Sequence, residues 1–188
     1  GHGVPGALMS MIGSGILRDA VSQTSDTSEI LKYLNKGIKS SLHQSDRNEL
    51  VRDGMDIAIC SIDIKKRIVR YAGAKIPLWI IKKGMLELEE IKGTREVIGG
   101  STNDNQYFES HELIFQKGDT FYLSTDGFAD QFSGNDGRKF MKKRFKEILL
   151  EMQDKSMQDQ EKYLQDTFEN WKAGSRQIDD ILVIGVRL

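Results

Sequence analysis

Residues 55–73 read Met-Asp-Ile-Ala-Ile-Cys-Ser-Ile-Asp-Ile-Lys-Lys-Arg-Ile-Val-Arg-Tyr-Ala-Gly. Apolar residues recur at every second position on both sides of the basic triplet 65–67, which is the period of a half-buried β-strand. The triplet predicts the turn of a hairpin between two strands. Short connections join antiparallel strands, because parallel strands need long crossovers, so the stretch predicts an antiparallel sheet.

Further strand-like runs follow the first hairpin. Residues 78–81 and 85–88 predict a second hairpin across Lys82-Lys83-Gly84. A third pair is predicted near 107–115 and 119–125, with its turn at Lys117-Gly118-Asp119. The strand region as a whole is therefore expected over about 54–125.

The last run, residues 181–186, is continuous and rich in β-branched residues. Such a run is typical of a strand buried on both faces, and we expect it over about 180–187.

Helical spacing flanks the strands. Apolar residues at intervals of three and four predict helices over residues 5–22 and from about Thr27, the predicted N-cap, to 43. Gly13 and Gly15 lower the helix propensity of the first segment, so they are expected to mark close packing. Two more helices are predicted over about 138–151 and 156–172.

Helices, a run of strands, helices and a last strand follow one another along the chain. This segregation predicts an α+β or layered α/β class, and the length of 188 residues favours a single domain over 1–188.

The composition argues against several classes of protein. Lys plus Arg number 27 against 28 for Asp plus Glu, so a net charge of −1 gives no long-range attraction to nucleic acid or to an anionic membrane. The single cysteine, Cys60, excludes an internal disulfide framework and fits the cytoplasm. No apolar run is long enough to span a membrane, although a longer parent protein could be membrane-tethered.

Two acidic turns adjoin strand-like runs. Asp126 follows residues 121–125 and precedes Gly127, while Asp179 and Asp180 stand before the last strand. Each turn alone could be an ordinary turn at the end of a strand, with its carboxylates in water. Carboxylates at strand ends can also converge on one spot, and clustered oxygen ligands are what a hard divalent cation requires.

Three motifs in order carry a resemblance to a known family. They are Gly-His-Gly-Val-Pro-Gly-Ala at 1–7, Ser-Thr-Asp-Gly-Phe at 124–128 and Ile-Asp-Asp-Ile-Leu-Val at 178–183. The set resembles the metal-dependent protein phosphatases (PPM family), in the bacterial branch typified by stage II sporulation protein E, over essentially the whole chain. This resemblance implies a layered sandwich of two antiparallel β-sheets flanked by helices, with two Mg²⁺ or Mn²⁺ ions at one end.

The resemblance also implies roles for individual residues. Asp126 and Asp179 correspond to catalytic metal-ligand aspartates, and Asp180 corresponds to a neighbouring position of variable role. Gly1 belongs to the metal motif by its place in the glycine-rich turn. His2 is a candidate general acid, against a turn-stabilising role or a disordered terminal residue.

The family pattern carries a bridging Asp and strands before the glycine-rich turn, and this chain begins at the Gly. The expectation is an N-terminally truncated portion of a larger protein that lacks the first strands, binds metal poorly and has little or no activity.

The function implied by the resemblance is a bacterial serine/threonine phosphatase. Its substrate would be a phosphorylated regulatory protein of the anti-sigma-factor antagonist type, and an upstream sensor or receiver module would act through residues 5–43, a candidate switch and homodimer surface. Two alternatives stay open. One is a non-catalytic phosphatase-like module that binds a partner, and the other is a metal phosphoesterase that acts on small molecules.

Overall fold

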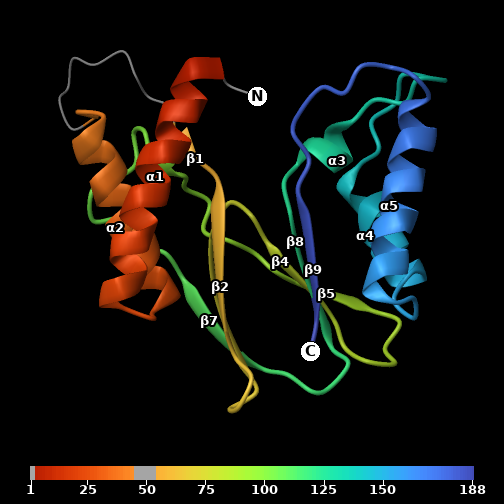
Figure 1. The fold of residues 1–188 in the computed structure, drawn as a ribbon, viewed down its shortest axis with the longest axis horizontal. Coiled ribbons are helices and arrows are strands. Elements are labelled where there is room, and N and C mark those ends of the chain that lie inside the picture. The colour runs from red at the N-terminus through yellow and green to blue at the C-terminus, as the bar shows by residue number, and fades with distance from the viewer. Residues whose placement is uncertain (1–2, 45–53) are drawn as a thin grey trace. The chain divides into compact units, whose positions relative to one another are not determined.

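The first hairpin is present as β2 (Ile57–Asp63) and β3 (Ile68–Ala74), in a computed structural model that describes residues 3–44 and 54–188 (Figure 1). The two strands pair antiparallel from Ile57 opposite Ala74 to Asp63 opposite Ile68. Gly1 and His2 lie outside the described residues. The chain divides into unit 1, Gly1–Leu78 with Ile91–Phe115, and unit 2, Trp79–Glu90 with Gln116–Leu188. The single domain over 1–188 stays a prediction.

Unit 1 combines two small antiparallel sheets with two helices. Strand β7 (Ser110–Ile114) pairs with β3, so the larger sheet has the order β2-β3-β7. A short ribbon joins β1 (Gly54–Met55) to β6 (Ile98–Gly99). The helices are α1 (Gly3–Gln23) and α2 (Thr27–Ser41), close to the predicted segments.

The N-terminus of α2 is capped one residue earlier than predicted. The carboxylate of Asp26, and not the hydroxyl of Thr27, accepts hydrogen bonds from the backbone N–H groups of Ser28 (2.8 Å) and Glu29 (3.2 Å). These bonds satisfy donors that the first turn of a helix leaves unpaired. The hydrogen bond from the Ser28 side chain and the two backbone bonds hold the pKa of Asp26 below its usual value.

The predicted apolar stripe of α2 is buried in unit 1. Ile30, Leu31, Leu34 and Ile38 pack with alanines of β3, with Ile98 and with Phe108. Of the two helix glycines, only Gly13 marks close packing as expected, because an added Cβ would lie 3.3 Å from Cε of Met55. The expectation is wrong for Gly15, where an added Cβ would meet nothing within 4 Å.

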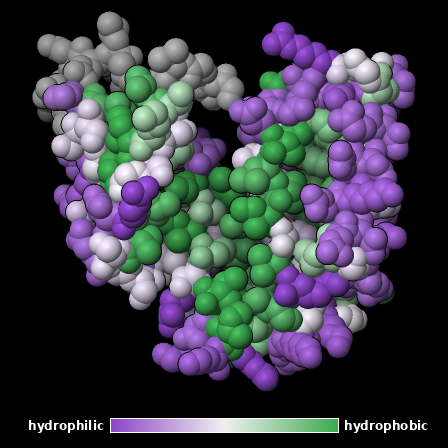
Figure 2. All heavy atoms as spheres, viewed as in Figure 1, coloured by the Kyte–Doolittle hydropathy of each residue, from purple (hydrophilic) through white to green (hydrophobic). Residues whose placement is uncertain are grey.

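Unit 2 is built on one antiparallel sheet. Its order is β5 (Leu88–Ile91), β4 (Leu78–Ile81), β8 (Thr120–Ser124) and β9 (Val183–Arg187). The helices of unit 2 are α3 (Gly127–Asp130), α4 (Lys142–Glu151) and α5 (Met157–Lys172). The exposed side of α5 is hydrophilic, while hydrophobic residues gather over the strands (Figure 2).

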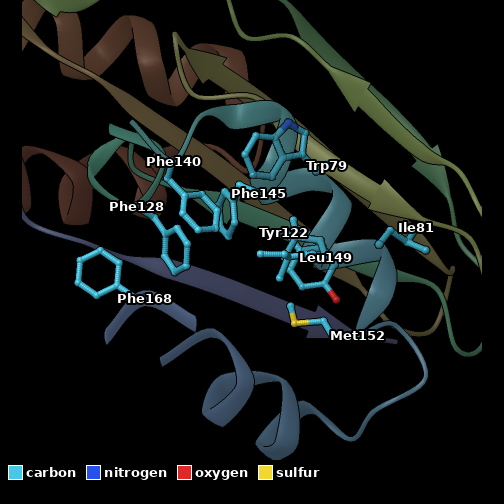
Figure 3. Close-up of a cluster of buried hydrophobic side chains, with 10 residues drawn as sticks. Trp79, Ile81, Tyr122, Phe128, Phe140, Phe145, Leu149, Met152 and Phe168 are labelled. Atoms are coloured by element: carbon cyan, nitrogen blue, oxygen red, sulfur yellow. The ribbon is translucent and has the colours of Figure 1, made fainter. Parts of the chain in front are cut away.

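Aromatic side chains dominate the core of unit 2 (Figure 3). The ring of Phe128 lies at its centre, with ring centroids 5.0 Å from Phe140, 4.5 Å from Phe145 and 5.3 Å from Phe168. Phe128 comes directly after the Asp126-Gly127 turn, so the packing of this core also positions that turn.

Three strand predictions need correction. The third hairpin is wrong, because β7 pairs with β3 while β8 pairs with β4 and β9 in another sheet. Strand β5 begins at Leu88, so residues 85–87 belong to the connection and not to the strand.

The last strand is not buried on both faces. It starts at Val183 and lies at the edge of its sheet, and Ile184 is 44% exposed. Its apolar run therefore does not make it a central strand.

The α+β class with antiparallel sheets and helices is confirmed. Within residues 3–44 and 54–188, no helix has the length and apolar character that crossing a membrane requires.

Candidate active site

Asp126 stands at the point where β8 ends and α3 begins. It occupies the N-cap position of α3, but its side chain makes no capping hydrogen bond, and the residue is exposed. Gly127, Phe128 and Ala129 of α3 are buried directly behind it. The carboxylate of Asp126 is therefore presented to solvent from a backbone that the aromatic core holds in place.

The second acidic turn is shaped by its own hydrogen bonds. The carboxylate of Asp179 accepts a hydrogen bond from the backbone N–H of Asp180 (2.8 Å). The side-chain amide of Gln177 donates to the carbonyl oxygen of Asp179 (2.7 Å). One oxygen of the Asp179 carboxylate is thus engaged within the turn, which lies just before β9.

Backbone contacts join the two acidic turns. The N–H of Thr125 donates to the carbonyl oxygen of Leu182 (3.0 Å), and the N–H of Leu182 donates to the Thr125 hydroxyl (3.0 Å). A Cβ added to Gly127 would lie 2.4 Å from the carbonyl oxygen of Asp180, so only glycine allows this approach. The structure therefore brings the Asp126 turn against the Asp180 turn at one end of the sheet.

Gln131 holds the segment that leads to the second turn, a role that the sequence analysis did not predict. Its side chain is fully buried, its amide donates to the Arg176 carbonyl (3.1 Å), and its amide oxygen accepts from the Ile178 N–H (3.2 Å). Its own carbonyl accepts from the indole N–H of Trp171 (3.0 Å). A glutamine in a polar loop has no local pattern that would mark this role.

The fit of this arrangement to a divalent metal is partial. The two turns offer carboxylate oxygens, the ligands that Mg²⁺ and Mn²⁺ prefer. Among residues 3–44 and 54–188, however, no group of three or more His, Cys, Asp or Glu side chains is placed to hold a metal ion. The predicted site residues Gly1 and His2 lie outside the described residues. The described residues thus offer carboxylate oxygens at two adjoining turns but no complete set of metal ligands, and a metal role for Asp126 and Asp179 stays a prediction.

The chain is similar to a known protein family and to solved structures. A family model described as stage II sporulation protein E (SpoIIE) matches residues 1–188. The SiaA-PP2C domain of Pseudomonas aeruginosa is 32% identical and superposes with a TM-score of 0.87, over 100% of this chain and 72% of that chain. Comparison with curated protein sequences returned no significant match.

Two more distant structures share the fold. One contains the RsbU and RsbW domains of Rv1364c from Mycobacterium tuberculosis, with 17% identity, a TM-score of 0.71 and coverage of 100% of this chain. This chain spans 49% of that protein, about half of its length. The other is RsbX in complex with magnesium, with 15% identity, a TM-score of 0.57 and coverage of 92% of this chain and 71% of that chain.

Proposed function

This chain belongs to the SpoIIE family of PP2C-like phosphatase domains found in signalling proteins, and on that premise we propose that it serves as a protein phosphatase dependent on Mn²⁺ or Mg²⁺. The proposed reaction is hydrolysis of phosphoserine or phosphothreonine on a small regulatory protein. The observation that carries the proposal is the contact between the Asp126 turn and the Asp180 turn, made through Thr125, Gly127 and Leu182.

Asp126 and Asp179 would hold the metal ions, with Asp180 beside them. When bound, a pair of such ions supplies an activated water and neutralises charge on the phosphoryl group. The chain's own contribution is placement, because the aromatic core fixes α3 behind Asp126 and Gln131 fixes the segment before Asp179. Gly1, and His2 as general acid, stay predictions.

The partners are also proposals. The Mycobacterium tuberculosis relative joins RsbU and RsbW domains in one chain, which supports a regulatory protein as the partner of this domain. We infer a substrate of the anti-sigma-factor antagonist type and an upstream sensor or receiver module that acts through α1 and α2. A homodimer through these helices and a cytoplasmic location belong to the same proposal.

The test is phosphate release from a phosphoserine peptide with and without Mn²⁺, for the intact protein and its Asp126→Asn variant. Little or no activity of residues 1–188 alone stays a prediction. We expect metal-dependent release that falls at least about a hundredfold in the variant, the scale of removing one charge-stabilising group from an active site. Asp166→Asn on the exposed side of α5 is the matched control and should leave the rate unchanged. Release that is independent of metal, or equal in Asp126→Asn, would contradict the proposal.

A non-catalytic binding module is the second candidate, because the described residues complete no three-ligand metal group. Calorimetric titration with Mn²⁺ separates the two candidates. An enzyme should bind Mn²⁺ and lose that binding in Asp126→Asn. A binding module should show no metal binding, no turnover and retained affinity for the phosphorylated partner. Comparing a phosphoprotein with phosphorylated small molecules tests the third alternative, a small-molecule phosphoesterase.

A further inference from the structure

A cavity of about 250 Å³ opens in unit 2, at the end of the sheet opposite to Asp126. Its walls are the end of β4 and the turn after it, the turn before β8, the connection between α4 and α5, and Arg187 of β9. Thr120 at the start of β8 lines the cavity, while Asp126 follows the end of β8. At about 3.3 Å per residue the two places are about 20 Å apart.

Cationic side chains dominate the walls of this cavity. Lys82, Lys83, Lys117 and Arg187 line it, and Asp154 is the one carboxylate among the lining residues. Lys82 lies 3.8 Å from the carboxylate of Asp119, which is buried below the turns. Across the described residues, no carboxylate forms an ion pair with Lys83, Lys117 or Arg187. The cavity therefore keeps a surplus of positive charge.

Arg187 is held rigidly in the wall. Its guanidinium donates to the Thr120 hydroxyl (3.2 Å), to the carbonyl oxygen of Lys155 (2.8 Å) and to that of Gln153. All three acceptors are neutral, so the positive charge is not cancelled. A guanidinium carries five N–H donors, so two remain for a ligand.

The turns that carry the lysines are preformed. The buried carboxylate of Asp119 accepts from the backbone N–H of Lys83 (2.9 Å) and from that of Gln116 (2.9 Å), which locks both turns together. Gly84 and Gly118 have φ values of +77° and +99°, which other residues rarely adopt. A site that is already ordered loses little conformational entropy when it binds its ligand.

Thr120 adds a polar group to the floor of the cavity. It is 3% exposed, and its hydroxyl oxygen accepts from the Arg187 guanidinium. The hydroxyl proton is then directed away from Arg187, and it can donate to a ligand oxygen.

We propose that this cavity binds a phosphate group, either inorganic phosphate or a phosphate monoester. A phosphate carries a charge of about −1.5 to −2 at neutral pH and several acceptor oxygens, which matches lysine ammonium groups, a fixed guanidinium and a hydroxyl. The cavity is smaller than the roughly 300–1,000 Å³ of a drug-sized site, so it suits a compact anion better than a nucleotide. The inference is independent of the proposed phosphatase activity, because it uses none of the acidic turns.

The test is an NMR titration of the ¹⁵N-labelled chain with potassium phosphate in metal-free buffer, with ionic strength held constant by potassium chloride. We expect saturable shifts at residues 82–84, 117–120 and 187, with a dissociation constant of about 1 mM or tighter. Removing metal keeps phosphate out of any metal-dependent site near Asp126. Shifts that do not saturate, or that cluster away from this cavity, would overturn the proposal.

Two exposed lysines provide the variants. Lys83→Gln and Lys117→Gln should each weaken binding several-fold, and the double variant by about tenfold or more, because each removes one full charge from the cavity. Lys143→Gln, at an exposed position of α4, is the matched control and should bind like the wild type. The spectrum of each variant reports whether it is folded. Equal affinity in a folded double variant would overturn the proposal.

A parallel titration with phosphoserine identifies the source of the group. Tighter binding of phosphoserine at the same resonances assigns the cavity to a phosphorylated side chain, and tighter binding of inorganic phosphate assigns it to the free ion. If neither competes with the other, the two anions do not share this cavity and the proposal fails.

Discussion

The two units of this chain differ in how the core relates to the chemistry. The core of unit 1 is mainly aliphatic and is built from Ile, Leu and Ala of α1, α2 and β3. The core of unit 2 is aromatic, and its central ring, Phe128, is two residues from Asp126. In unit 2 the packing of the core and the geometry of the Asp126 turn therefore depend on the same segment, so a change in one alters the other.

The polar ties of unit 1 serve a different purpose. The buried Asn35 of α2 accepts from the Gly99 N–H (2.8 Å) and donates to the Asn103 carbonyl (2.8 Å). Such bonds satisfy backbone groups that would otherwise be buried unpaired. They fix a helix to a loop of unit 1 and touch neither acidic turn.

The largest difference should come from truncating one side chain in each core. Phe128→Ala should lower the free energy of unfolding by about 3–5 kcal/mol and Leu34→Ala by about 2–5 kcal/mol, because each leaves a cavity. Only Phe128→Ala should also weaken Mn²⁺ binding. Chemical denaturation of both variants measures stability, and calorimetric titration measures Mn²⁺ affinity. An equal loss of Mn²⁺ affinity in both variants would contradict the difference between the units.

A smaller effect should follow from adding one methyl group to a glycine. Gly127→Ala places a Cβ 2.4 Å from the carbonyl oxygen of Asp180, so the turns must separate, at a cost of about 1–3 kcal/mol in the free energy of unfolding. The matched variant is Gly15→Ala in α1, where the methyl group meets nothing within 4 Å. This variant should raise stability by about 0.5–1 kcal/mol, because alanine favours the helix. Thermal unfolding compares them, and a stabilising Gly127→Ala would show that the two turns do not pack closely.

The smallest change in the free energy of unfolding should come from replacing a helix cap. The pH dependence of this change should differ between the two units. Asp26 caps α2 with a carboxylate, while Ser156 caps α5 with a hydroxyl that accepts from the Asp159 N–H (3.1 Å). Replacing either residue by Ala should cost about 1 kcal/mol in the free energy of unfolding at neutral pH.

The pH dependence follows from the lowered pKa of Asp26 in the folded chain. Its stabilising effect is complete above the unfolded pKa of about 4 and is lost as the pH falls through the lower folded pKa. The cost of Asp26→Ala should therefore shrink in acid, while the cost of Ser156→Ala should persist, as urea denaturation at both pH values would reveal. A constant cost for Asp26→Ala would mean that the carboxylate charge does not contribute to the cap.

The spacing of apolar residues predicted much of the secondary structure of unit 1 and less of the strand pairing of unit 2. Period-two alternation identified β2 and β3, and helical spacing identified α2, because each buries one face against its own unit. The tight turn at 117–119 suggested a hairpin that does not exist, since its flanking strands join different sheets. A turn reveals only that the chain changes direction, and the choice of strand partner depends on residues distant in sequence.

The same limit applies to the site. Asp126, Asp179 and Asp180 were identified from their positions at strand ends, and their metal roles stay predictions. Gln131 was not identified, because its partners Trp171, Arg176 and Ile178 lie 40 to 47 residues away and nothing local distinguishes it. The edge position of β9 was missed for a related reason, since an apolar run reveals burial tendency and not the number of neighbouring strands.

Periodicity, turn residues and ordered motifs are local or linear properties, and they were sufficient to predict most of the helices and strands, the acidic turns and the family. Three features became known from the folded chain alone: which strands share a sheet, the close approach of Gly127 to the backbone of Asp180, and the cavity lined by Lys83, Lys117 and Arg187. These contacts join residues far apart in the chain, and they are set by how two different cores pack, the aliphatic one in unit 1 and the aromatic one in unit 2.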